Sequence, residues 1–296
     1  MKKRIGIRVR RTVKLLLILA AVLILSAPAL AEGGLRGYTK EEGYVYLRLG
    51  KYPQKEDGGI EPILWRVLTV DEEKAYLLSE YILFARAMHP SLKEYRDVIK
   101  GDFAQTELCQ YLNTTFAEEA FTEEEMSMLL PCKNFGKVFL ITRKDIQNKE
   151  IGLGVWSKPG VDPTPKQIKD NPMSRAYGTE WAIKNNGYDP EEYPDPSVHV
   201  MNAAGTDEVT LQEKRLYVFK AQWGSFSPQW VRDQSTKDKR HAGATKDGGQ
   251  IGHIEVGRDN IGARPALYLA MGSYQIVSGT GTMEDPFEIV PADAAE

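Results

Sequence analysis

The stretch "DNIGARPALYLA", residues 259–270, places an arginine and a proline directly before an apolar run that predicts a strand. A proline suits the first position of a strand, because no hydrogen bond of the ladder is lost there. A buried charge without a partner is very costly. We therefore expect Arg264 to turn its guanidinium toward a carboxylate or backbone carbonyls, and Pro265 to begin the strand.

A second arginine, Arg232, occurs in the same kind of setting in "WVRDQS", residues 230–235. Two interpretations apply to Arg232 and Arg264. They fasten loops to the core, or they form a basic pair that lines a cleft for an acidic or sugar ligand. We favour the structural role, and we expect Trp230 to be a core residue because of its place in the strand.

The order of elements predicts an α+β domain. Alternating apolar residues indicate strands at 43–54 and 137–146 and two strands within 61–83 joined at 71–73. Further strands are expected in "RLYVFKA" (215–221) and "SPQWVRDQS" (227–235), in a hairpin around "ATKDGGQIGHIEV", and in "ARPALYLA" and "DPFEIV". We expect mostly antiparallel sheets, a short helix pair and long loops.

The helix pair is predicted at 106–116 and 121–131. Thr122 and Glu125 have the spacing of a capping box, and Pro131 ends the second helix. Residues 147–210 are rich in Pro, Asp and Gly and form a loop-rich insertion, with one helix expected between Ser174 and Gly187.

The first 31 residues have the layout of a secretory signal peptide. Seven Lys or Arg come first, then an apolar run of 13 residues, Leu15–Ala27, then Ala29-Leu30-Ala31. We expect export to the cell surface or medium, with cleavage after Ala31; the alternative is an uncleaved membrane anchor. A linker at 32–42, one domain at 43–290 and a tail at 291–296 complete the plan.

The net charge argues against nucleic acid as a partner. The chain has 38 basic and 41 acidic residues. Without the seven basic residues of the signal segment, 31 basic residues face 41 acidic ones, a net charge of −10. The average field of such a protein repels polyanions.

The only cysteines are Cys109, in the first predicted helix, and Cys132, directly after the second, and the helix pair could bring them close together. In an exported chain this pair permits a disulfide. Alternatively, both are small buried thiols, since a free cysteine packs as an apolar residue.

No metal site is expected. A two-residue turn places His241 and His253 on opposite faces of their hairpin, and a three-residue loop places them on one face but staggered by two residues. The acidic stretch 188–197 lacks the ligand spacing of a calcium loop and is interpreted as a solvated loop. We expect no cofactor.

No catalytic constellation is recognisable in the sequence, which has no nucleophile elbow, no His-Glu-x-x-His and no phosphate-binding glycine loop. Aromatic residues in loops are the remaining candidates, because large stiff rings form recognition platforms for sugars and peptides. The ligand-binding candidates are Trp223, Phe226, Tyr177 and Trp181.

Several segments, taken in order, resemble an uncharacterised domain family of secreted bacterial proteins: "LGKYPQ", "ILWRVLTVDEEKAYLLSEY", "LCQYLNTTFAEEAFTEEEMSMLLP", "KVFLIT", "SRAYGTEWA", "WVRDQS", "ATKDGGQI" and "GARPALYL". The similarity spans Gly43 to Leu269. Asp233-Gln234 stand where the family has Ser-Pro. The closing Trp-x-Arg and Gly-x-Arg-Pro-Ala pattern is similar to the C-type lectin-like and formylglycine-generating-enzyme architecture, which implies a C-type lectin-like core.

The sequence therefore favours an exported, non-catalytic recognition module for a glycan, a peptide or a surface protein. The alternatives are an extracellular hydrolase or oxidase with a site assembled from scattered residues, and a structural component of the envelope.

Overall fold

The computed structural model describes residues 34–154, 177–185, 199–201, 208–210, 219–221, 224–226, 228–235, 238–245 and 251–295. The predicted signal segment and most of the insertion at 147–210 lie outside these residues. From Leu35 onward the described residues belong to one compact unit.

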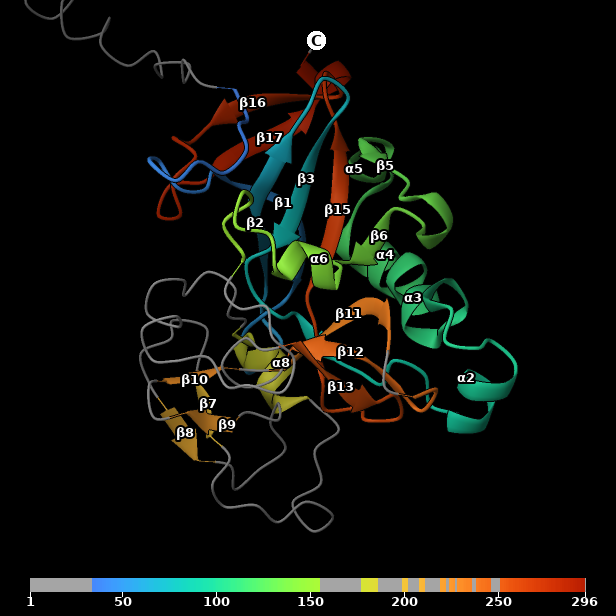
Figure 1. The fold of residues 1–296 in the computed structure, drawn as a ribbon. Coiled ribbons are helices and arrows are strands. Elements are labelled where there is room, and N and C mark those ends of the chain that lie inside the picture. The colour runs from blue at the N-terminus through green and yellow to red at the C-terminus, as the bar shows by residue number, and fades with distance from the viewer. Residues whose placement is uncertain are drawn as a thin grey trace, which may run out of the picture. The chain divides into compact units, whose positions relative to one another are not determined.

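An eight-stranded sheet forms the larger part of this unit (Figure 1). Its spatial order is β16-β17-β1-β2-β3-β15-β5, and β6 also pairs with β15. β1 and β17 run parallel, and the other pairs are antiparallel. The strands are β1 (Tyr46–Pro53), β2 (Ile60–Val70), β3 (Lys74–Ser79), β5 (Leu129–Leu130), β6 (Val138–Leu140), β15 (Pro265–Ala270), β16 (Tyr274–Ser278) and β17 (Phe287–Pro291).

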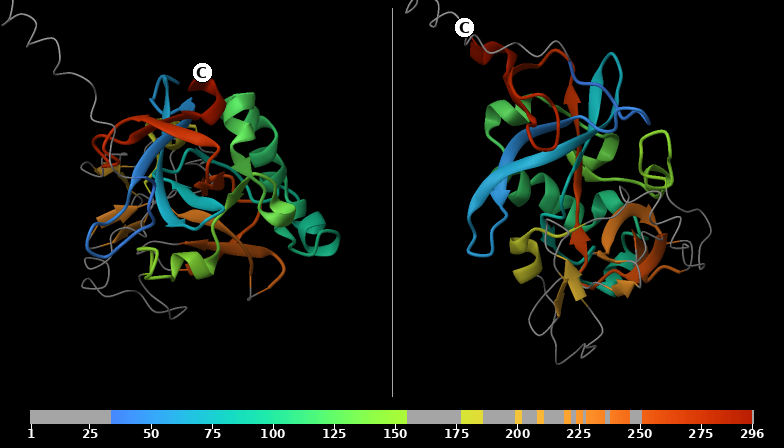
Figure 2. Two further views of the ribbon diagram at one scale, coloured as in Figure 1. Left: turned by 90° about the horizontal axis from the view of Figure 1, so that it is seen from above. Right: turned by 90° about the vertical axis from the view of Figure 1, so that its left-hand side faces the viewer.

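A five-stranded sheet has the order β13-β12-β11-β14-β4. It lies at the lower end of the larger sheet in Figure 1, and Figure 2 shows the two from the side. Its strands are β4 (Phe84–Ala85), β11 (Gln229–Gln234), β12 (His241–Thr245), β13 (Ile251–Glu255) and β14 (Gly262–Ala263). Two small hairpins pair β7 (His199–Met201) with β8 (Glu208–Thr210) and β9 (Phe219–Ala221) with β10 (Gly224–Phe226).

Short helices complete an α+β fold, as predicted. The α-helices among the described residues are α2 (Leu92–Asp97), α3 (Glu107–Asn113), α4 (Thr115–Ala120), α5 (Glu123–Ser127), α6 (Arg143–Ile146) and α8 (Glu180–Lys184). The predicted capping box is present at α5, where Thr122 accepts from the Glu125 amide and Glu125 accepts from the Thr122 amide. Single 3₁₀ turns form at η1 (Phe103–Gln105), η2 (Lys133–Phe135) and η5 (Ala292–Ala295).

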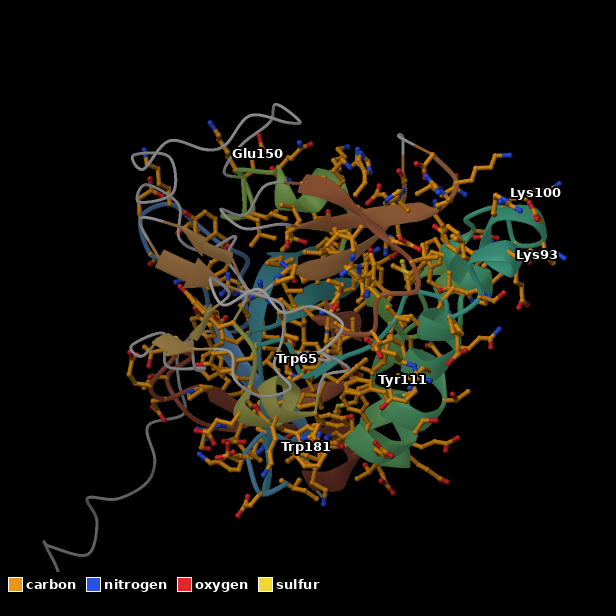
Figure 3. The ribbon with its side chains drawn as sticks, turned by 90° about the horizontal axis from the view of Figure 1, so that it is seen from below. Trp65, Lys93, Lys100, Tyr111, Glu150 and Trp181 are labelled. Carbon is orange, nitrogen blue, oxygen red and sulfur yellow. The ribbon has the colours of Figure 1, made fainter. Side chains whose placement is uncertain are left out.

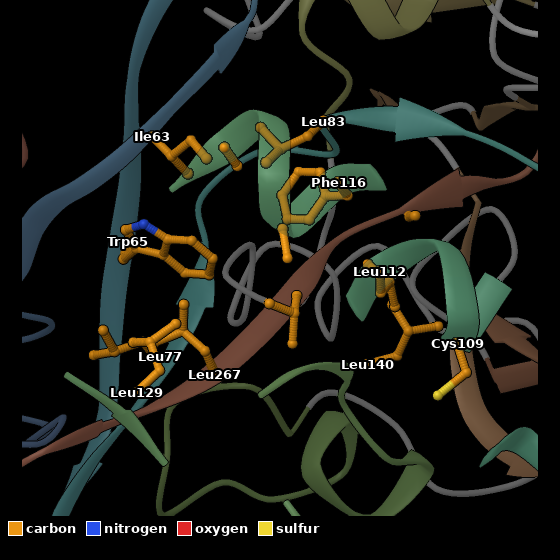
Figure 4. Close-up of a cluster of buried hydrophobic side chains, with 14 of the residues drawn as sticks. Ile63, Trp65, Leu77, Leu83, Cys109, Leu112, Phe116, Leu129, Leu140 and Leu267 are labelled. Atoms are coloured by element: carbon orange, nitrogen blue, oxygen red, sulfur yellow. The ribbon is translucent and has the colours of Figure 1, made fainter. Parts of the chain in front are cut away.

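The main core lies between the large sheet and helices α3 to α5. Figure 4 shows Trp65, Leu77 and Leu267, from three neighbouring strands, beside Phe116 and Leu112 of the helices. All five side chains are fully buried. The Trp65 indole also donates to the Leu49 carbonyl at 2.8 Å, so this large ring is buried without an unpaired polar group.

Some predicted boundaries are wrong. The strand expected at 137–146 stops at Leu140, because Thr142 and Asp145 form a capping box that starts α6. The second helix of the pair ends at Ser127, and Leu129–Leu130 form the strand β5 instead. The helix expected from Ser174 begins at Glu180 with Thr179 as its cap.

The ends of the domain also differ from the plan. Leu35, in the expected linker, is buried in the main core, and the Tyr38 amide donates to the Leu68 carbonyl. Within the expected tail, Pro291 ends β17 and the Ala292 amide donates to the Ser273 carbonyl. The domain therefore includes residues on both sides of 43–290.

Buried tyrosines predict a loss of stability at alkaline pH. Burial raises the pKa of Tyr46 and of Tyr95 to about 12, against about 10 in an unfolded chain. A raised folded-state pKa gives stability that is fully present below pH 10 and is lost as the pH rises toward 12. We expect the free energy of unfolding to fall by on the order of 2 kcal/mol per such tyrosine between these pH values.

Urea denaturation at pH 8 and pH 11 measures this change, with Tyr95→Phe as a variant that removes one contribution. A variant whose pH dependence equals that of the wild type would contradict the assignment to Tyr95.

Candidate functional site

Arg264 occupies the single position between β14, in the smaller sheet, and β15, in the larger one. A second crossing lies beside it, where residues 80–83 connect β3 of the larger sheet to β4 of the smaller one. Ala266 is opposite Leu78 in the antiparallel ladder, so the same register places Arg264 opposite Glu80. The short β3–β4 and β14–β15 connections between the sheets therefore meet at these two charged residues.

The Arg264 side chain uses only part of its donor set. Its Nε donates to the Ser79 carbonyl at 2.6 Å, and its Nη2 lies 4.0 Å from Glu80 Oε2. Neither Nη1 nor Nη2 has a hydrogen-bond partner in the described part of the chain. The Arg264 side chain is 0% exposed, so these N–H groups are withdrawn from water. Burying these N–H groups without hydrogen-bond partners lowers the free energy of unfolding considerably.

Glu80 is shared with a second buried arginine. Arg66 binds it in a two-pronged geometry, with Nε to Oε2 at 2.7 Å and Nη2 to Oε1 at 2.6 Å. The Arg66 guanidinium also lies 4.7 Å from the centre of the Tyr44 ring. Two guanidinium groups therefore share one carboxylate in a buried setting.

The pKa values reflect this imbalance. Burial lowers the pKa of Arg66, but the Glu80 carboxylate more than offsets it and holds that pKa above its ordinary value. Burial, and then the charge of Arg66, lowers the pKa of Arg264 to about 9. Arg264 is thus the cation whose charge the protein stabilises least.

Gln229 adds a second set of unsatisfied polar atoms. Its Cα pairs with that of Gly262 in the parallel β11–β14 ladder, two residues before Arg264. Side chains alternate along a strand, so Gln229 lies on the face of β11 opposite to Trp230, which belongs to the main core. The Gln229 side chain is buried, and its Nε2 and Oε1 lack partners among the described residues.

We call Arg66, Glu80, Gln229 and Arg264 the junction cluster. It contains unused N–H donors of a cation and, paired two residues before that cation, a buried amide that offers one donor and one acceptor. Such a set fits a carboxylate together with a neighbouring hydroxyl or amide group, because a guanidinium binds carboxylates through two parallel hydrogen bonds.

Arg232 is in a different setting from Arg264, on β11. Its guanidinium lies 5.0 Å from the Phe135 ring centre and 5.2 Å from that of Phe139, and its Nη1 donates to Cys132 Sγ at 3.4 Å. The two arginines therefore do not form one basic pair. Trp230 is fully buried, and its indole donates to the Arg86 carbonyl at 2.7 Å.

The aromatic candidates are placed as follows. Tyr177 is half-buried, and its carbonyl accepts from the Ile82 amide, within the 80–83 crossing. Trp181 on α8 is partly buried (Figure 3). Its ring lies so close to Gly58 that a Cβ atom on that residue would be 3.2 Å from it. Trp223 lies outside the described residues. Phe226 ends β10, and its side chain is likewise outside them.

Cys109 and Cys132 are both free and buried in the structure. They flank the η2 turn, and Asn113 holds that turn by donating to the carbonyls of Phe135 and Val138 at 2.8 Å each. No disulfide joins the two thiols in the structure.

The histidines of the β12–β13 hairpin follow the three-residue-loop register. His253 pairs with Gly243, so it lies on the face of His241 but two residues further along. His241 Nδ1 is 2.6 Å from Asp238 Oδ1. The described residues contain no group of three potential metal ligands. The acidic stretch 188–197 lies outside them.

The sequence matches no family model, no curated protein and no solved structure. In the part of the chain that the structure describes, no helix has the length and apolar character needed to cross a membrane.

Sequence reasoning singled out Arg264 but missed Arg66, Glu80 and Gln229. A signal was available for Arg66, which interrupts the apolar strand "ILWRVL" and is therefore expected to need a buried partner. No local signal marks Glu80 or Gln229, because register between distant strands brings them to Arg264.

Removing either charge of the cluster should have unequal effects on stability. Glu80→Gln leaves two buried cations without their anion, and we expect a loss of about 3–5 kcal/mol in the free energy of unfolding. Arg264→Met removes the less stabilised cation and one hydrogen bond, so we expect a change within about 1 kcal/mol.

Urea denaturation of both variants and of the double variant tests this expectation, and the double variant should recover part of the Glu80→Gln loss. Equal losses for the two single variants would show that Arg264 is fully satisfied where it lies.

Proposed function

We propose that this chain is an exported, non-catalytic recognition module, and that it binds a ligand carrying a carboxylate at the junction cluster. One observation carries the proposal: the two Nη groups of the buried Arg264 have no hydrogen-bond partner among the described residues. An anionic ligand group would supply the negative charge that the cluster lacks.

The chemistry of the cluster narrows the class of ligand. A carboxylate matches the fork of guanidinium N–H groups better than a single-point anion does. The Gln229 amide then suits a hydroxyl or an amide next to the carboxylate. A uronic-acid unit of a glycan and an acidic peptide both have these groups.

Tyr177, one of the aromatic candidates, lies near the 80–83 connection that contains Glu80. Gly178 forms a parallel bridge with Ile82, two residues from Glu80. Tyr177 therefore lies beside the 80–83 crossing, where a stiff ring can contact a sugar or a peptide. Trp223, Phe226 and Trp181 remain candidate contacts in this proposal.

The wider setting of the proposal comes from the sequence. The signal-like segment 1–31 supports export, and the resemblance to a secreted bacterial domain family supports a C-type lectin-like core. Both are part of the proposal.

The complete burial of Arg264 predicts that the ligand associates slowly. Because the side chain is fully buried, covering side chains must move before a ligand reaches the Nη groups. Binding that requires such a change has a lower association rate than docking to an open surface.

Calorimetric titration tests the proposal with two acid and neutral pairs: an oligogalacturonate with its methyl ester, and an acidic peptide with its amidated form. We expect one acid to bind and its neutral counterpart to bind at least tenfold more weakly. Arg264→Met should abolish the difference, whereas Arg96→Met, in the exposed pair with Asp97 on α2, should leave it unchanged.

The two pairs distinguish a glycan from a peptide ligand. Equal affinity for acid and neutral forms in both pairs, or unchanged binding by Arg264→Met, would refute the role of the junction cluster.

A further inference from the structure

A second polar cluster surrounds Cys132, which immediately precedes the η2 turn. Arg232 Nη1 donates to Cys132 Sγ at 3.4 Å, and the Arg232 guanidinium is itself held over the rings of Phe135 and Phe139. The sulfur therefore has a fixed positive charge beside it. Such a charge stabilises the negative charge that a sulfur nucleophile carries.

Tyr268 on β15 is the second partner of this sulfur. Burial, followed by the charge of Cys132 and a hydrogen bond with it, raises the pKa of Tyr268 to about 12. A tyrosine hydroxyl is protonated at neutral pH and can donate a hydrogen bond to Cys132 Sγ. The sulfur thus contacts two donor groups, one of them cationic.

Cys109 has the opposite surroundings, although it flanks the same turn. Its Sγ donates to the Phe135 carbonyl at 3.6 Å. Burial, and then the charge of Asp102, raises the pKa of Cys109 to about 11. A thiol that donates to a carbonyl near a negative charge stays protonated and is a poor nucleophile. Cys109 therefore serves as an internal control for the reactivity of Cys132.

We propose that Cys132 is the reactive thiol of this protein and that it undergoes thiol–disulfide exchange with small organic disulfides. Cys132 is 6% exposed, which favours a small reagent over a protein partner. The inference is independent of the junction cluster and of the carboxylate ligand.

The step balances without a further oxidant. Cys132 releases its proton to solvent, and its sulfur attacks one sulfur of the disulfide. The bond from Cys132 to that sulfur forms as the original S–S bond breaks. The second sulfur leaves with the bonding electron pair as a thiolate. Cys132 is oxidised to a mixed disulfide, and the leaving group is reduced to a thiol. Arg232 acts by stabilising the attacking sulfur, so it is a positioning residue.

The test treats the folded full-length chain with 4,4′-dithiodipyridine and follows release of thiopyridone by absorbance. We expect a fast phase of one thiol per chain that Cys109→Ser retains and Cys132→Ser loses. Arg232→Gln should slow this phase by about tenfold, and Arg232→Lys, which keeps the charge, should restore part of the rate. Mass spectrometry of the quenched protein identifies the labelled residue.

The dependence of the rate on reagent concentration separates this reaction from unfolding. Reaction of the folded protein is first order in reagent, whereas labelling limited by unfolding is independent of it. If Arg232→Gln does not fold, Tyr268→Phe is the second variant, and it should slow the phase by a smaller factor. Faster labelling of Cys109, an unchanged rate in both variants, or a rate independent of reagent would overturn the inference.

Discussion

The hydrogen bond from Arg264 Nε to the Ser79 carbonyl joins residues 185 positions apart and links the β14–β15 connection to the end of β3. On one side of it β14 becomes β15, and on the other β3 leads into β4. Arg264 makes this bond in a fully buried position, and the cost of burying its charge is offset in part by Glu80 and increased by the charge of Arg66.

The incomplete neutralisation of Arg264 by Glu80 links the fold to the proposed function. One carboxylate cannot satisfy two guanidinium groups, and the geometry gives Glu80 to Arg66 at 2.6 and 2.7 Å and leaves Arg264 at 4.0 Å. Among the described residues Nη1 and Nη2 of Arg264 have no hydrogen-bond partner, and an apolar residue at this position would avoid that cost. A site that awaits an anion from a ligand does gain from them, because preorganised donors are not reoriented on binding.

The sequence predicts those features that depend on local signals. The strand that begins at Pro265, the turn between β2 and β3 and the Thr122–Glu125 capping box all follow from residues close together in the chain. The α6 turn was missed although its signal was of the same kind, because Thr142 and Asp145 follow an apolar run that predicts a strand. The partners of Arg264 could not be predicted, because strand register places them, and register between distant strands has no local signature.

The measurement that tests the central claim most directly is ¹⁵N NMR of the arginine side chains, with Arg264 assigned from the signals missing in Arg264→Lys. If Arg264 holds the crossing segments through Nε and keeps Nη1 and Nη2 for a ligand, its Nε–H exchanges with water far more slowly than that of the exposed Arg96. Its Nη signals then shift when an acidic ligand is added, while the Nε signal stays in place. An Arg264 Nε–H that exchanges as fast as that of Arg96 would contradict the structural part of the account, and Nη signals unmoved by any acidic ligand would contradict the functional part.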